Sequence, residues 1–165
     1  MAFDAFLKID GIEGESTDDK HQKWIEVLSY SHGVTQMPSG SSSSGGGRSA
    51  ERCDHADFSI VKTLDKASPK LNLHCCNGSH IKSIEFQLCR ATGDKQPYMH
   101  YKLEDVIVSS VRPGGSSQGG EALPLEEVSF NYGKITWTYT EIDHKSGKAS
   151  GKVEANWSVV ENKGG

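Results

Sequence analysis

Apolar and polar side chains alternate over most of this chain, the pattern of β-strands that face a core on one side and water on the other. Residues 2–10 show it clearly, with Phe3, Leu7 and Ile9 on one face and Phe6 as an apolar exception on the other. The same alternation predicts further strands over residues 24–36, 56–65, 84–90, 98–111, 128–132, 134–142 and 152–160. Seven or eight strands of this kind predict a β-barrel or a sandwich.

Two of these strands depart from simple alternation. Residues 98–111 change phase near Asp105, as they would at a β-bulge. Residues 24–36 are predicted to form one strand whose faces differ in character. One face carries Trp24, Leu28 and Tyr30, and the other carries Ile25, Val27, Ser29 and Ser31. The second face therefore becomes small and polar toward its end.

One segment, residues 68–78, predicts a helix. Ser68 is expected to cap it, Pro69 suits the first turn, and Gly78 supplies a left-handed stop. Leu71 and Cys75 would share its packed face. A helix of about nine residues must be held by packing onto the sheet.

Residues 38–50 are rich in Gly and Ser and are predicted to form a flexible loop. The whole chain of 165 residues fits a single domain, 1–165, which contains this loop. Loops of such length inside a domain are usually functional or disordered.

The charge balance argues against nucleic acid as a partner, because 18 basic residues are scattered among 22 acidic ones and the formal charge is −4. No window approaches the roughly 20 apolar residues of a membrane span, and the N-terminus lacks the features of a signal peptide. We therefore expect that the protein is made in the cytoplasm and that it does not insert into a membrane. The four cysteines are expected to be reduced thiols: Cys53, Cys75, Cys76 and Cys89.

The search for reaction chemistry finds little. Gly115–Gly119 matches the Gly-x-Ser-x-Gly pattern around Ser117, but no helix follows it, so a turn is favoured. The clusters 53–55 and 74–80 hold Cys and His without the paired spacing of a zinc site. His21 is expected to form local hydrogen bonds. We predict no catalytic residues, no metal and no cofactor.

Several segments resemble the Hcp (haemolysin-coregulated protein) family of the bacterial type VI secretion system. The resemblance is carried by residues 6–11, 14–16, His21, 25–31, Gly33, 62–69, Cys75, Gly78, Tyr101, Leu103, 105–110 and 132–135. These segments run in order over most of the chain. The departures are the loops 38–52 and 112–122, the C-terminal tail, and His32, where relatives commonly have tryptophan.

This resemblance implies a structural protein rather than an enzyme. The fold it implies is mainly β, an antiparallel β-barrel built from two sheets with one short flanking helix. Six copies would form a ring with a wide channel, and rings would stack into a tube inside a contractile sheath, with a trimeric spike protein at the tip. The tube would be expelled, so that the protein leaves the cell without a signal peptide. Family members also carry or chaperone small effectors in the lumen.

The resemblance also points to residues. Ser31 aligns with a position that faces the channel, and Ser29 shares its face, so both are expected to contact cargo. Ring stacking is expected to involve five residues of the Gly/Ser-rich loop: Ser39, Gly40, Ser43, Gly46 and Arg48. Two other functions stay open, a monomeric barrel that binds a small ligand in its interior and a hydrolase that uses Ser117.

Overall fold

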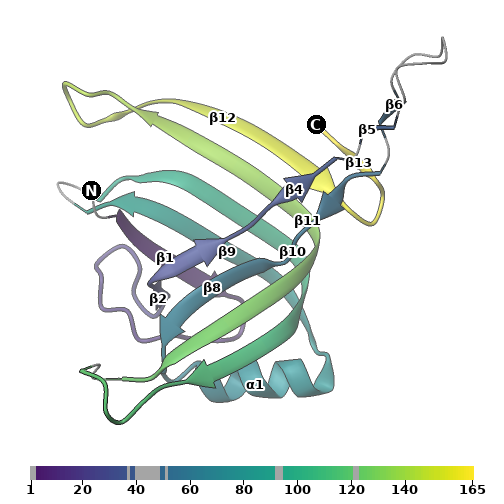
Figure 1. The fold of residues 1–165 in the computed structure, drawn as a ribbon. Helices are drawn as coiled ribbons and strands as arrows, with labels where there is room; N and C mark the ends of the chain where they lie inside the picture. Colours follow the sequence, from purple (N-terminus) through teal and green to yellow (C-terminus); the bar gives the residue numbers. More distant parts are fainter. Residues whose placement is uncertain (1–2, 37, 40–48, 51, 92–94, 121–122) are drawn as a thin grey trace.

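The computed structural model describes residues 3–36, 38–39, 49–50, 52–91, 95–120 and 123–165. Thirteen strands and one helix are assigned to this part of the chain (Figure 1). The first strands are β1 (Phe3–Ile9), β2 (Ile25–Val27), β3 (Ser29–Ser31), β4 (Val34–Thr35), β5 (Pro38–Ser39), β6 (Ser49–Ala50), β7 (Asp54–His55) and β8 (Phe58–Thr63). After the helix α1 (Ser68–Asn77) come β9 (His80–Arg90), β10 (Pro97–Gly114), β11 (Leu125–Ile142), β12 (Ala149–Ser158) and β13 (Lys163–Gly164).

Nine strands form one sheet in which every pairing is antiparallel. The main order is β13-β12-β11-β10-β9-β1-β2, and β8 pairs with both β11 and β3. Two small sheets, β4-β7 and β5-β6, complete the pairings among the described residues, and β5-β6 lies apart at the upper right of Figure 1. A mainly β, antiparallel fold with one short helix is therefore confirmed.

Strand β11 pairs with three other strands. Along one edge it pairs with β10. Along the other edge its first part pairs with β8 and its second part with β12. The sequence pattern predicted two strands here, 128–132 and 134–142. That prediction is wrong, since the 18-residue strand runs through Gly133.

The predicted single strand 24–36 is also wrong, because it is divided into β2, β3 and β4. The side-chain phase changes at Leu28, which is 58% exposed. Before it, Ile25 and Val27 are buried. After it, Ser29 and Ser31 are exposed and Tyr30 packs against the core. The two serines therefore do not continue the face of Ile25 and Val27.

The phase change predicted near Asp105 is present in β10. Leu103 and Val106 are both buried, and Asp105 between them is exposed with a φ of 52°. Opposite it lies Gly133, where an added Cβ would stand 3.1 Å from the Asp105 carboxylate. A second irregularity follows, since the β10–β11 register shifts between Val108 and Ser110. Strand pairing continues to Gly114, so the loop predicted over residues 112–122 begins later than expected.

Helix α1 ends as predicted but begins differently. Gly78 has a left-handed φ of 66°, and its N–H donates to the carbonyl of His74. At the start the N-cap is Ala67, with no side-chain cap hydrogen bond, so the prediction that Ser68 caps the helix is wrong. The Ser68 hydroxyl is instead bonded to buried charged groups. Leu71 is fully buried and Cys75 packs against the core, as expected of the packed face.

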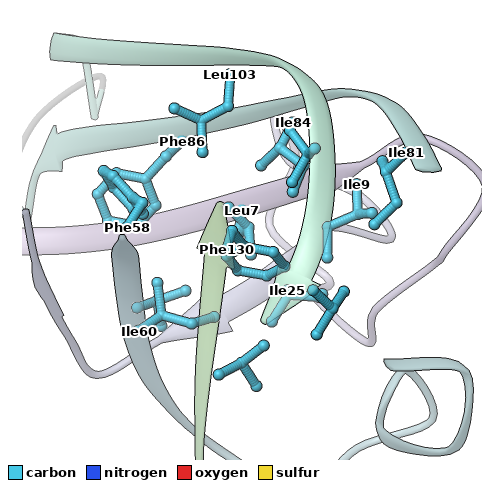
Figure 2. Close-up of a cluster of buried hydrophobic side chains, with 14 of the residues drawn as sticks. Leu7, Ile9, Ile25, Phe58, Ile60, Ile81, Ile84, Phe86, Leu103 and Phe130 are labelled. Carbon is cyan, nitrogen blue, oxygen red and sulfur yellow. The ribbon is translucent and has the colours of Figure 1, made fainter. Parts of the chain in front are cut away.

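The core lies between the curved strands (Figure 2) and is filled by large apolar side chains. Leu7, Phe58, Phe86 and Phe130 are inaccessible to solvent. The Phe58 and Phe86 rings meet at 5.1 Å between centroids in an edge-to-face arrangement. No helix in the described part of the chain has the length and apolar character of a bilayer span.

Candidate functional site

The predicted cargo residues lie on an outward face of the sheet. Ser29 and Ser31 belong to β3, which pairs antiparallel with β8. Ser31 stands opposite Ser59, and both residues are at least partly accessible. The change of phase at Leu28 is what turns these serines outward.

The structure adds further serines that sequence reasoning did not select. Ser59 stands opposite Ser129 on β11, and Ser129 stands opposite Ser110 on β10. Residues directly opposite in a sheet project to the same side. The Ser59 and Ser129 hydroxyl oxygens are 2.8 Å apart, which confirms that these two side chains meet. We call the surface formed by Ser29, Ser31, Ser59, Ser110 and Ser129 the serine face.

Charged and amide groups border the serine face. The carboxylate of Asp57 accepts hydrogen bonds from the Ser109 hydroxyl at 2.7 Å and from the Asn131 amide at 3.0 Å. On the other side, Arg112 and Glu127 stand opposite each other across β10 and β11. The sequence carried a partial signal for this border, because Glu127 and Asn131 alternate with the buried apolar residues of β11.

The chemistry of the serine face is that of recognition. Hydroxyl groups donate and accept hydrogen bonds and present little bulk. A nucleophilic serine needs an adjacent base. Among the described residues, no histidine is hydrogen-bonded to a serine of this face. The arrangement therefore suits reversible contact with another molecule.

A buried ionic cluster lies on the inward side of the same strands, and the sequence analysis missed it. Lys62 on β8 and Glu126 on β11 are both 0% exposed and stand opposite each other. Lys62 Nζ lies 2.8 Å from Glu126 Oε2 and 2.8 Å from Asp65 Oδ1. Ser68 donates its hydroxyl to Glu126 at 2.7 Å and accepts from Lys62 at 3.2 Å. The cluster thereby fastens the start of α1 to the sheet.

A recognisable signal for this cluster was present. Phe58, Ile60 and Lys62 share the inward phase of β8, and Glu126 shares the inward phase of β11 with Val128. Opposite charges in the apolar phase of two strands indicate a buried ion pair.

His21 is confirmed as a hydrogen-bonding residue. Its ring is 2% exposed, with Nδ1 at 2.7 Å from Asp18 and Nε2 at 2.7 Å from Gln87. The ring also stacks on Phe6, with 4.1 Å between centroids. This contact explains why Phe6 is buried although it lies outside the main apolar phase of β1.

The histidines considered for metal binding are hydrogen-bonded to other groups. His74 is bonded to the Lys70 carbonyl and His80 to Asp105. No group of three or more potential ligands gathers among the described residues. Around Ser117, the Gly119 N–H donates to the Ser116 carbonyl in a turn, and the next described element is the strand β11.

Aromatic rings surround His32. Its ring centroid lies 5.6 Å from that of Phe58, 6.2 Å from Tyr101 and 5.8 Å from Tyr132. Both ring nitrogens are buried without a hydrogen-bond partner among the described residues. Burial first, and the nearby His55 second, lower the pKa of His32.

Of the predicted stacking residues, Ser39 lies in β5 and stands opposite Ser49 of β6. Part of the predicted loop is therefore paired as a strand. Gly40, Ser43, Gly46 and Arg48 lie outside the described residues.

The antiparallel sheet, its one short helix among the described residues and an outward face of small hydroxyl groups define a mainly β protein with a surface suited to recognition. Comparison with known proteins gives the family. The model of the family described as "Type VI secretion system effector, Hcp" matches residues 6–139. The chain belongs to the Hcp family, whose members are secreted structural proteins of the type VI secretion system rather than enzymes.

Relatives and solved structures match over nearly the whole chain. "Protein hcp1" of Pseudomonas aeruginosa is 36% identical over 163 residues, which is 98% of each chain. The "Major exported protein" of the same species is 30% identical and covers 89% of this chain and 94% of its own. A solved structure titled "Structure of a type six secretion system protein" has a TM-score of 0.93 at 36% identity, with 99% of this chain and 100% of that chain covered. Hcp1 from Salmonella typhimurium has a TM-score of 0.81 at 33% identity, with 99% of each chain covered.

Proposed function

We propose that this chain is the subunit of a type VI secretion inner tube. Six copies form a ring, and the rings stack inside a contractile sheath behind a trimeric spike protein. The tube is made in the cytoplasm, expelled without a signal peptide, and holds small effectors in its lumen. Family membership over nearly the full length supports this assembly.

In this proposal the sheet of each subunit closes on itself as a barrel. Strands β2 and β3 are separated by Leu28 alone. Strand β2 pairs with β1, and β3 pairs with β8, which in turn pairs with β11. The Leu28 N–H donates to the Val61 carbonyl at 2.8 Å, which supports closure at this point.

The observation that most directly supports ring formation is an apolar groove beside the last long strand, β12. The groove has a volume of about 1100 Å³ and is lined in part by Phe3, Tyr139 and Val153, which are 44%, 51% and 73% exposed. Among the described residues, the outer edge of β12 pairs only with the two-residue strand β13. Exposed apolar side chains beside an uncovered strand edge favour association. A ring that closes by rotation would cover this groove with a different surface of the neighbouring copy.

The first test is the mass of the purified protein by multi-angle light scattering. Six copies of the 17.9 kDa chain correspond to about 107 kDa. Val153→Asp places a charge in the groove and should give a monomer. Val160 is 72% exposed but does not line the groove, so Val160→Asp is the matched control and should keep the hexamer. A wild-type monomer at every concentration would refute the ring.

The serine face is proposed to line the channel and contact cargo. Its small hydroxyl groups leave the lumen open and can bond to varied polar surfaces. Ser31→Gln introduces a longer side chain on this face and should abolish co-purification of an effector. Ser117 lies in an exposed turn, so Ser117→Gln is the control and should have no effect. Unchanged cargo binding by Ser31→Gln would refute the assignment.

The alternative of a barrel with an interior ligand finds less support. Phe58, Phe86 and Phe130 fill the interior that a ligand would occupy (Figure 2). The segment 38–50, with the five residues named for stacking, is proposed to contact the next ring. Deletion of residues 40–48 should shorten assembled tubes and leave single rings intact.

A further inference from the structure

A groove distinct from the serine face is lined by residues of β1, of the β1–β2 loop and of the start of α1. Its volume is about 610 Å³. Four lysines line it from separate segments: Lys8 of β1, Lys23 before β2, Lys66 before α1 and Lys70 in the first turn of α1. We call this surface the lysine groove. Such a concentration of positive charge contrasts with the net charge of −4 of the whole chain.

The carboxylate of Glu13 shows how an acidic group fits among these lysines. Its two oxygens lie 3.9 Å from Lys23 Nζ and 3.7 Å from Lys66 Nζ, so one carboxylate bridges two segments. Both contacts are long, and all three side chains are about half exposed or more. Exposed pairs of this kind contribute about 0–1 kcal/mol and are easily exchanged. A carboxylate of another molecule can therefore replace Glu13.

The remaining lysines are available for such a partner. Among the described residues, neither Lys8 nor Lys70 forms an ion pair with a carboxylate. Lys8 Nζ lies 5.9 Å from the centroid of the Trp24 ring, which forms part of the groove wall. Tryptophan is enriched among the residues that contribute most to protein–protein binding.

We propose that the lysine groove binds an acidic peptide segment of a protein partner. The carboxylates of this segment take the place of Glu13 between Lys23 and Lys66 and extend to Lys70. A peptide is favoured over nucleic acid because the group that bridges Lys23 and Lys66 in the structure is a carboxylate, that of Glu13. The inference concerns a second surface and does not depend on ring formation or cargo binding.

The test uses fluorescein-labelled hexaglutamate and fluorescence anisotropy at about 20 mM salt, where surface charges are weakly screened. The double variant Lys66→Gln/Lys70→Gln should weaken binding about tenfold, as expected for two lost charge contacts. Lys145→Gln/Lys148→Gln makes the same charge change in the exposed β11–β12 turn and should leave binding unchanged. Circular dichroism spectra confirm that each variant is folded.

A variant with the opposite effect makes the test more specific. Glu13→Gln removes the internal competitor and should tighten hexaglutamate binding about threefold. Glu15→Gln alters charge equally but lies outside the groove lining, and it should have no effect. Equal weakening by both lysine double variants, no tightening by Glu13→Gln, or no binding at all would overturn the proposal. Stronger binding of a six-nucleotide single-stranded DNA to the same lysines would replace the peptide with nucleic acid.

Discussion

Replacement of Lys62 by methionine tests the buried ionic cluster directly. The substitution keeps an unbranched side chain in the same space but removes the ammonium group, which lies 2.8 Å from both Glu126 and Asp65. Glu126 is 0% exposed and would keep only the Ser68 hydroxyl as a partner, because its Oε1 has none among the described residues. Breaking a buried pair in this way costs about 3–5 kcal/mol. We expect the free energy of unfolding to fall by that amount.

The assay is equilibrium unfolding in urea, followed by circular dichroism at fixed protein concentration, since assembly also contributes to stability. Lys66→Met is the matched control. Its side chain is 49% exposed and pairs only at 3.7 Å with Glu13, so its loss should cost less than about 0.5 kcal/mol.

A second substitution shows whether the loss comes from the stranded carboxylate. Lys62→Met/Glu126→Met replaces both charges with apolar groups and should be more stable than Lys62→Met alone. Two results would refute the reasoning. One is a cost below about 1 kcal/mol for Lys62→Met, and the other is additive losses in the double variant.

Two further predictions concern ionisable groups in apolar surroundings. Burial lowers the pKa of His32 in the folded protein, so the unfolded chain takes up a proton first as the pH falls. The stability that the neutral His32 ring contributes is therefore full above about pH 6.5 and is lost as the pH falls toward the pKa of the folded state. Relative to His32→Phe, the wild type should lose at most about 1.4 kcal/mol between pH 7.5 and 5.5 in urea unfolding, and a constant difference would contradict this. Burial raises the pKa of the Cys89 thiol to about 11, so iodoacetamide at about pH 8 should label the exposed Cys76 and leave Cys89 unlabelled in the folded protein, as mass spectrometry can show.

The alternation of apolar residues was sufficient to predict most strands, because a sheet with one buried face imposes a period of two. It failed where one residue changes the phase. At Leu28 the inward and outward faces of the strand exchange. The number and order of apolar residues across 24–36 do not indicate at which residue this exchange occurs. The division predicted at Gly133 was wrong for the opposite reason, since its missing side chain allows the close approach of Asp105 and does not end the strand.

The serine face could be predicted only in part. The resemblance to a family pointed to Ser31, and the alternating pattern pointed to Ser29. Both kinds of evidence concern residues that are close together in the sequence. Ser59, Ser110 and Ser129 join them through strand order and register, which depend on contacts between residues far apart in sequence. Ser68 illustrates the same limit. Its neighbours in the sequence predicted that it would cap the helix, but its hydroxyl donates a hydrogen bond to Glu126, which is distant in sequence.

The buried pair and the serine face depend on one register. In β8 and β11, Lys62 opposite Glu126 faces inward, while Ser59 opposite Ser129 faces outward. A slip of β8 by one residue would turn its side chains to the other face, bringing Ser59 inward and Lys62 outward. Glu126 would then be buried without its cation, which costs several kcal/mol. The pair thus disfavours slipped pairing, and the energy that holds α1 to the sheet also keeps the serines aligned on its outer side.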